Sequence, residues 1–159
     1  MLSDSLIIWQ AHKKGDSMIR KTVEELKAGD TAEIAKTISE SDIYLYAAIT
    51  GDLNPAHTDE EYAKKTFFKT RIAQGMLLAG FISAVVGNKL PWPGTIYVKR
   101  KLNSLAPVRI GDTITARAEV TRIIPEQNKV RSKTNCINHE GAPVLDGKAV
   151  VSPPISPKQ

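Results

Sequence analysis

The sequence has little of what marks several common protein classes. With a single cysteine, Cys136, it cannot form an internal disulfide. Its most apolar run, residues 76–87, is shorter than the roughly 20 residues that a membrane-spanning helix needs, and the run at residues 6–9 is too short for a signal peptide. It has no zinc-ligand spacing, no glycine-rich phosphate loop and no aromatic RNA-binding motif. We therefore expect a cytoplasmic protein with no metal, and with neither a membrane nor a nucleic acid as partner.

The composition is that of one ordinary globular domain. The chain has 159 residues, of which 42% are hydrophobic and 25% are charged. Residues 1–17 differ in character from the rest, and Met18 offers a second plausible start. We interpret residues 1–17 as an N-terminal extension and residues 18–159 as a single domain.

The positive charge is concentrated in the second half of the chain. Residues 96–159 hold 11 lysines and arginines against 5 acidic residues, a net charge of +6, whereas residues 1–95 hold 11 against 12. A basic segment of this kind can bind nucleic acid, an anionic membrane or a phosphorylated small molecule, and it can equally form a sheet face that is exposed to solvent.

The first half of the domain predicts a strand followed by short helices. Residues 31–38 alternate as a strand does, and Ser39 or Ser41 can cap a helix that ends at residues 50–51. That helix cannot continue, because Pro55 pushes the residue before it out of the helical region. We predict a further short helix with Thr58 as its cap.

The second half predicts one long helix and four strands. Residues 72–87 are apolar all round, which predicts a helix that is buried on all sides. Turn-type sequences then separate predicted strands at residues 95–104, 112–124, 128–138 and 142–151. This order indicates an α+β domain, and we predict the hot-dog fold, an antiparallel sheet of about five strands wrapped around a long central helix. Its free edge strand predicts a homodimer or a dimer of dimers.

Asp52 and His57 are the first candidates for chemistry, since they stand five residues apart on the loop that Pro55 interrupts. A carboxyl and an imidazole close together supply an acid and a base near neutral pH, as hydration of an activated alkene requires. Structural roles stay open for both. Asp52 can close a turn, Asn54 can form an Asx-turn, and His57 can simply precede a helix cap.

The start of the long helix is the second candidate. Its first amides have no intrahelical partner, and the helix dipole favours negative charge beside them. The segment Gln74-Gly75-Met76 would form an oxyanion site for a thioester oxygen, because Gly75 has no side chain to block the approach. Close packing is the alternative reason for this glycine.

Three segments carry a resemblance to a known family. Residues 44–63 (YLYAAITGDLNPAHTDEEYA) resemble the hydratase-2 motif of MaoC-like (R)-specific enoyl-CoA hydratases, in which G-D-x-N-P-x-H is quite specific. Residues 74–80 (QGMLLAG) resemble the opening of that family's central helix, and residues 94–112 are similar as well. The likeness covers roughly residues 20–152. It implies reversible addition of water to trans-2-enoyl-CoA, giving (R)-3-hydroxyacyl-CoA, with no cofactor because CoA is part of the substrate.

The same resemblance implies roles for individual residues. Asp52 and His57 fall on the catalytic pair that holds one water, Asn54 on the asparagine that shapes the loop, and Gly75 on the oxyanion-hole amide. We take His57 as the base and Asp52 as the proton donor to C2, although the pair can titrate as a unit.

Two positions depart from the family pattern. Ala56 stands where Leu, Ile or Val is usual, which enlarges or loosens a local contact. Gln74 stands where His is common, and since glutamine is uncharged and still forms hydrogen bonds, we expect activity to survive.

Residues that contact the substrate are predicted less directly. Besides Asn54 and Gln74, the acyl chain would be lined by apolar side chains that can equally be ordinary core, namely Phe67, Phe68, Ile72, Met76 and Leu77. The phosphates of CoA have candidate partners on the predicted sheet. Lys99 and Lys101 share one face of their strand, Arg100 takes the other face of that strand, and Arg131 lies on another strand.

Three other functions stay open. A 3-hydroxyacyl-ACP dehydratase would run the same chemistry on an acidic carrier protein, which suits the basic half of the chain. A hot-dog thioesterase would hydrolyse the thioester, and the intact motif argues against it. A non-catalytic acyl-CoA-binding module would bind without turnover. Polyester precursor supply, fatty-acid degradation and a specialised acid pathway are all compatible with the sequence.

Overall fold

The computed structural model describes residues 23–155, so the interpretation of residues 1–17 as an extension concerns residues outside the described part. A short 3-10 helix, η1 (Val23–Glu25), opens the described chain. It is followed by β1 (Thr31–Thr37), α2 (Glu40–Thr50), α3 (Pro55–Thr58), α4 (Glu60–Lys64), α5 (Gly75–Asn88), β2 (Ile96–Ser104), β3 (Thr113–Ile124), η2 (Pro125–Gln127), β4 (Lys129–Ile137) and β5 (Pro143–Ser152). Within residues 23–155, none of the helices has the length and apolar character that crossing a membrane requires.

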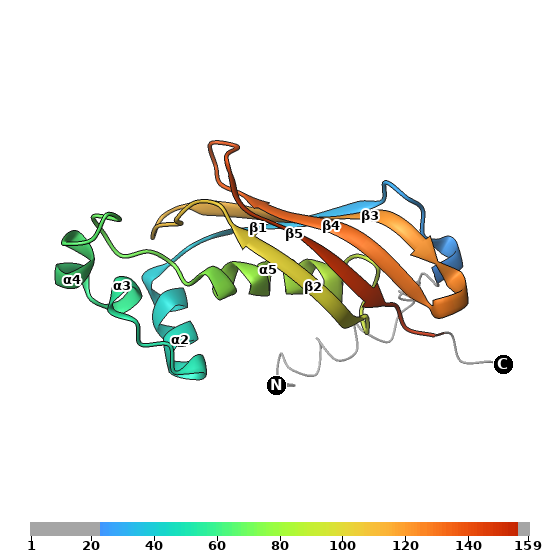
Figure 1. Ribbon diagram of the computed structural model, residues 1–159, viewed down its shortest axis with the longest axis horizontal. Helices are drawn as coiled ribbons and strands as arrows, with labels where there is room; N and C mark the ends of the chain where they lie inside the picture. The colour runs from blue at the N-terminus through green and yellow to red at the C-terminus, as the bar shows by residue number, and fades with distance from the viewer. Residues whose placement is uncertain (1–22, 156–159) are drawn as a thin grey trace, which may run out of the picture.

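The five strands form one antiparallel sheet with the order β1-β3-β4-β5-β2. Each predicted strand is confirmed to within one residue at either end. The alternation that predicted them is visible in β4, where Val130, Ser132, Thr134 and Cys136 are buried and their neighbours are not. Figure 1 shows the sheet arching over α5, so the predicted hot-dog fold is confirmed.

Helix α5 packs one apolar face into the concave side of the sheet. Leu78, Ile82 and Val85 are buried there in a single cluster with Ile114 and Val130 of the strands. The prediction of burial on all sides was wrong, since Met76 is 54% exposed and Gly80 is exposed as well. The helix therefore has a second face that is at least partly exposed within residues 23–155.

The predicted start of this helix at residue 72 was also wrong. Ile72 forms a β-bridge with Arg109, and the N–H of Ala73 donates to the Val108 carbonyl at 2.8 Å. These pairings keep the segment extended until Gln74, the N-cap, so helical geometry begins only at Gly75.

Helices α2, α3 and α4 lie beyond the N-terminal end of α5 (Figure 1). Ser39, one of the two predicted caps, forms a capping box with Asp42 at the start of α2. The prediction of Thr58 as a cap was wrong, because Thr58 is the last residue of α3. Its neighbour Asp59 caps α4 by accepting the Tyr62 N–H at 3.0 Å. A carboxylate is the stronger acceptor and also favours the positive end of the helix.

Cys136 is a small core residue on β4. Its side chain is fully buried between the sheet and α5, with Sγ 3.8 Å from the Leu78 carbonyl oxygen. Burial raises the pKa of this thiol to about 12.

Gly147 of β5 gives the first test of this packing. A Cβ built there would collide with the Lys101 carbonyl oxygen of β2 and lie 2.8 Å from Leu102 Cδ2. We expect Gly147→Ala to lower the free energy of unfolding in urea by about 2 kcal/mol or more, because neighbouring backbone has to move. Lys148→Ala, which alters the adjacent exposed residue, should change it by less than about 0.5 kcal/mol. Equal stabilities for the two variants would contradict the close approach of β2 to β5 at Gly147.

Candidate active site

The loop between α2 and α3 holds Asp52. Helix α2 ends at Gly51, whose φ of 76° is the left-handed conformation that glycine adopts readily. The Asp52 N–H donates to Thr50 Oγ1 at 3.3 Å, and one carboxylate oxygen of Asp52 accepts from the Asn54 N–H, also at 3.3 Å. Asp52 is half-buried, and its carboxylate closes a turn; a catalytic role for it stays a prediction.

Asn54 is the N-cap of α3. Its side-chain oxygen accepts from the Ala56 N–H at 3.1 Å, and its carbonyl accepts from the His57 N–H at 2.9 Å. The predicted Asx-turn is therefore present. These contacts place His57 on the first turn after the loop, and a direct contact of Asn54 with substrate stays a prediction.

His57 is held through one ring nitrogen. Its Nδ1 lies 2.8 Å from the carbonyl oxygen of Ile72. A carbonyl can only accept, so Nδ1 carries the hydrogen, and the other ring nitrogen, Nε2, keeps its lone pair in the neutral ring. The half-buried ring therefore offers a proton acceptor away from Ile72, which is what a general base needs.

The same extended segment connects His57 to the start of α5. The Ile72 N–H donates to the Ala56 carbonyl at 3.2 Å, so this segment is tied to the loop as well as to the ring. Gly75 follows three residues later. Within residues 23–155, neither the Gly75 N–H nor the Met76 N–H has a hydrogen-bond acceptor. Free amides at a helix N-terminus favour a negatively charged oxygen.

Gly75 itself is exposed, and a Cβ there would approach Ser104 Oγ of β2 at 3.3 Å. The absence of a side chain at Gly75 thus lets β2 pack closely against it, and it also leaves the Gly75 N–H accessible to a ligand. Asp52 and His57 make no direct hydrogen bond to each other among the described contacts, and the turn through Asn54 is what links them.

Gln74 is 1% exposed. Its Nε2 donates to the Ile43 carbonyl of α2 at 3.2 Å, while its Oε1 has no partner. The glutamine therefore keeps one structural hydrogen bond, to α2. As the N-cap of α5, Gln74 connects the start of that helix to α2.

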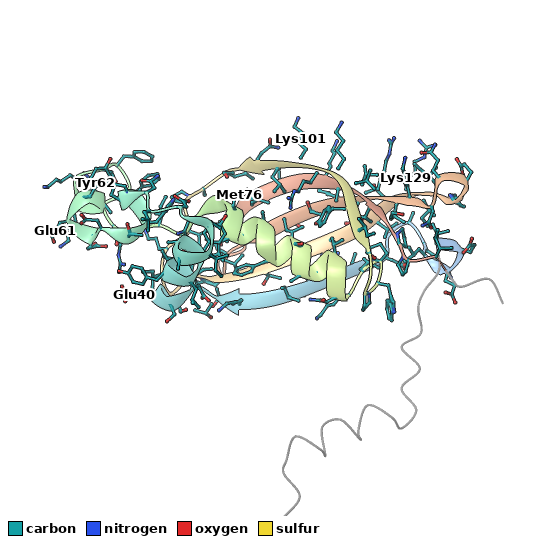
Figure 2. All side chains as sticks on the ribbon, turned by 90° about the horizontal axis from the view of Figure 1, so that it is seen from below. Glu40, Glu61, Tyr62, Met76, Lys101 and Lys129 are labelled. Carbon is teal, nitrogen blue, oxygen red and sulfur yellow. The ribbon has the colours of Figure 1, made fainter. Side chains whose placement is uncertain are left out.

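The residues predicted to line an acyl pocket are only partly brought together. Ile72 and Leu77 are half-buried beside the helix start, and Met76 is exposed at its first turn (Figure 2). Phe67 is 81% exposed and contacts Phe68, with ring centroids 3.8 Å apart. In a single chain these side chains therefore border an open surface.

Arg71 is a residue that the sequence reasoning missed. Its side chain, 13% exposed, donates to Glu40 and to the Tyr44 hydroxyl of α2, while its backbone N–H donates to Glu60 of α4 at 3.2 Å. The guanidinium also lies 5.6 Å from the centre of the Tyr44 ring. The signal was a lone arginine directly before the extended segment, with an acidic residue in the first turn of each neighbouring helix.

These contacts shift the pKa values of Glu60 and Arg71 in the directions that favour their charged forms. The Arg71 backbone N–H holds the pKa of Glu60 below its ordinary value, and the hydrogen bond to Glu40 raises the pKa of Arg71. Since the pKa of Glu60 is depressed on folding, its contribution to stability is present above the ordinary glutamate pKa and is lost as pH falls through the lowered value.

The CoA-phosphate candidates lie on two sides of the sheet, as predicted. Lys99, Lys101 and Arg131 point to the outer face, away from α5. Arg100 pairs with the buried Ala149 and lies over the Tyr97 ring at 5.5 Å, on the inner side.

We expect Arg71→Met to lower the free energy of unfolding by about 1–2 kcal/mol, because it removes the guanidinium that bonds Glu40 and the Tyr44 hydroxyl, while Glu60 keeps the backbone N–H of residue 71. Urea unfolding at pH 7 measures this. Lys64→Met removes only an exposed pair with Glu61 and should leave the midpoint of urea unfolding almost unchanged. If Arg71→Met is no worse than Lys64→Met, Arg71 does not hold the helices together.

Comparison with known proteins places the chain in a family. The model of the MaoC like domain matches residues 21–140. The (R)-specific enoyl-CoA hydratase of Rhodospirillum rubrum is 54% identical over 139 residues, covering 87% of this chain and 96% of that protein. The 3-hydroxybutyryl-CoA dehydratase of Methylorubrum extorquens is 47% identical over 131 residues, covering 82% and 83%.

Solved structures agree with these sequence matches. The unliganded R-hydratase PhaJ1 from Pseudomonas aeruginosa superposes with a TM-score of 0.79 at 40% identity, covering 87% of this chain and 92% of that one. Together with the matched family model and the shared sequence, the fold shows that this chain belongs to the MaoC-like family of hot-dog proteins.

Proposed function

We propose that this protein is an (R)-specific enoyl-CoA hydratase, which adds water reversibly to trans-2-enoyl-CoA and gives (R)-3-hydroxyacyl-CoA. The observation that carries the proposal is the orientation of His57. Its Nδ1–H is bonded to the Ile72 carbonyl at 2.8 Å, which leaves Nε2 free to act as a base, and the segment that holds the ring leads three residues later into a helix start with free amides. The 54% identity to a protein of that name supports the substrate class.

In the proposed mechanism, Nε2 of His57 removes a proton from water while the water oxygen attacks C3 of the enoyl group. The electron pair of the double bond moves through C2 toward the thioester oxygen. The amide of Gly75 and the dipole of α5 stabilise the negative charge that develops there. Asp52 delivers a proton to C2, and the proton taken up by His57 returns to Asp52 to restore the starting state.

This chemistry needs only an acid, a base and hydrogen-bond donors. We therefore propose that the enzyme works without a metal or another cofactor, with CoA as part of the substrate. The acyl chain would lie against Ile72, Met76 and Leu77, with Phe67 at the border. We also propose a cytoplasmic location, where acyl-CoA thioesters and a reduced cysteine coexist.

We further propose that the enzyme is a homodimer at least. The second apolar face of α5 includes Met76 and Gly80 and has no cover among the described residues. Strand β2 is an open edge of the sheet and carries exposed Ile96 and Val98. A second copy that pairs along β2 would cover both features and would exclude water from the acyl chain.

The catalytic roles are tested with crotonyl-CoA by following the absorbance of the enoyl thioester. We expect the wild type to remove the band, and both Asp52→Asn and His57→Ala to lower kcat/KM by at least about 100-fold, because each removes a proton-transfer group. His139→Ala, in an exposed turn, should keep full activity.

Product analysis then separates the alternatives. A chiral assay should find the (R) alcohol. Release of a free thiol would instead indicate a thioesterase, and turnover only with carrier-protein thioesters would indicate a dehydratase of that class. A wild type that binds enoyl-CoA thioesters without turning them over would contradict the proposed function.

The dimer is tested at its proposed edge. Val98 is 53% exposed on β2, and Val98→Asp would place a charge in the interface. We expect light scattering after gel filtration to give the mass of a single chain for this variant, with reduced activity. Ala35→Asp adds the same negative charge at an exposed position of β1, the strand at the opposite edge of the sheet, and should leave the mass unchanged. A monomeric wild type at micromolar concentration would refute the proposal.

A further inference from the structure

The outer face of the sheet is hollowed into a groove of about 830 Å³ that crosses β2, β5, β4 and β3. Six cationic side chains line it, namely Lys99, Lys101, Arg122, Arg131, Lys133 and Lys148. Figure 2 shows Lys101 projecting from β2 on the side away from α5. The groove is thus separated from Asp52, His57 and Gly75, none of which lines it.

The strand register brings these cations together. Lys101 stands opposite Lys148, and Lys148 stands opposite Lys133 on its other side. In the next row Arg131 stands opposite Arg122. Neighbouring strands are about 5 Å apart and successive outward residues about 7 Å apart. Like charges directly opposite one another destabilise a sheet, so this arrangement carries a cost in the free chain.

Little negative charge compensates this row. Asp146 is the one carboxylate in the lining, and it already accepts from Asn103 Nδ2 at 2.7 Å. Glu119 stands opposite Lys133 at the rim without forming an ion pair. Within residues 23–155, none of the six cations takes part in an ion pair. Six of the eleven lysines and arginines of residues 96–159 are therefore gathered in this groove without an ion-pair partner among the described residues.

Size and lining narrow the ligand class. A volume of 830 Å³ is that of a small-molecule site. No aromatic side chain lines the groove, so it lacks the stacking surfaces with which single-stranded nucleic acid is bound. Phosphate groups suit lysine and arginine rows, since each phosphate accepts several charge-assisted hydrogen bonds. We infer that this groove is a binding site for a nucleotide-sized ligand that carries two or more phosphate groups.

Such a ligand has two possible sources. One is a free nucleotide or oligophosphate, which would make the groove a second site on the enzyme. The other is the phosphorylated nucleotide of the CoA thioester itself, a reading that rests on the proposed function. Ser104, at the end of β2, lies beside Gly75, and Lys101 lies three residues back along the same strand, so the strand links the oxyanion amide to the groove.

The site is tested by calorimetry on the full chain with adenosine 3′,5′-bisphosphate and with inorganic tripolyphosphate. We expect both to bind the wild type, adenosine to show no binding, and the double variant Lys133→Gln/Lys148→Gln to weaken binding by at least about 10-fold. This variant removes repulsion between unpaired lysines, so it should fold normally. Lys27→Gln/Lys65→Gln makes the same change in net charge outside the groove and should bind like the wild type.

Two results would overturn the inference. One is absence of binding of both phosphate compounds to the wild type. The other is equal weakening in the two double variants, which would mean that only net charge matters. Neither readout requires turnover, so failure of the site and failure of the proposed hydratase activity are distinguished.

Steady-state kinetics then show whether the bound phosphates belong to the CoA substrate or to a separate ligand. If the groove holds the nucleotide of the substrate, Lys133→Gln/Lys148→Gln should raise KM for crotonyl-CoA by about 5-fold or more with kcat unchanged, since it removes binding that ground and transition state share. The same variant should leave the kinetics of crotonyl-pantetheine, which lacks the nucleotide, unaltered. If the ligand is a separate molecule, KM for crotonyl-CoA stays constant although phosphate binding is lost.

Discussion

The extended segment from Ile72 to Gln74 is the constraint on which the rest of the site depends. Its main chain binds the His57 ring, the loop at Ala56 and the Val108 carbonyl at the same time. Because all three contacts use backbone atoms, no side-chain change in this segment can remove them directly. The helix that follows begins at Gly75, and its first amides, which have no acceptor among the described residues, come three residues after the carbonyl that holds the His57 ring.

Arg71 serves the same segment from the outside. Because it directly precedes Ile72, it joins the extended segment to α2 and α4 in one network of charges and hydrogen bonds. The helices beyond α5 bury few residues of their own, since α3 buries none and α4 buries only Ala63. The polar network of Arg71 is thus a main contact between these helices and the rest of the domain. Arg71 directly precedes Ile72, whose carbonyl orients the His57 ring.

Much of the fold could be predicted from the sequence because local patterns decide it. Period-two alternation located the strands to within one residue, and Gly51 with Pro55 located the loop of Asp52 and His57. The errors arose where distant parts of the chain compete with local pattern. Pairing with Val108 delays the start of α5, Asp59 is a stronger cap than Thr58, and the apolar pattern of α5 does not say whether its own sheet or another molecule covers each face. Arg71 was missed since its partners come from two separate helices, α2 and α4, that are distant from it in the sequence or turn toward it only in the fold.

The single thiol has a practical consequence for studying this enzyme. Cys136 is sealed between α5 and β4, and with a pKa near 12 it holds almost no thiolate at neutral pH. Reagents that colour on reaction with thiols will therefore leave the folded protein untouched. Free CoA can be quantified in the presence of the enzyme without a background from the protein, and any slow reaction of Cys136 reports how often the sheet opens away from its helix.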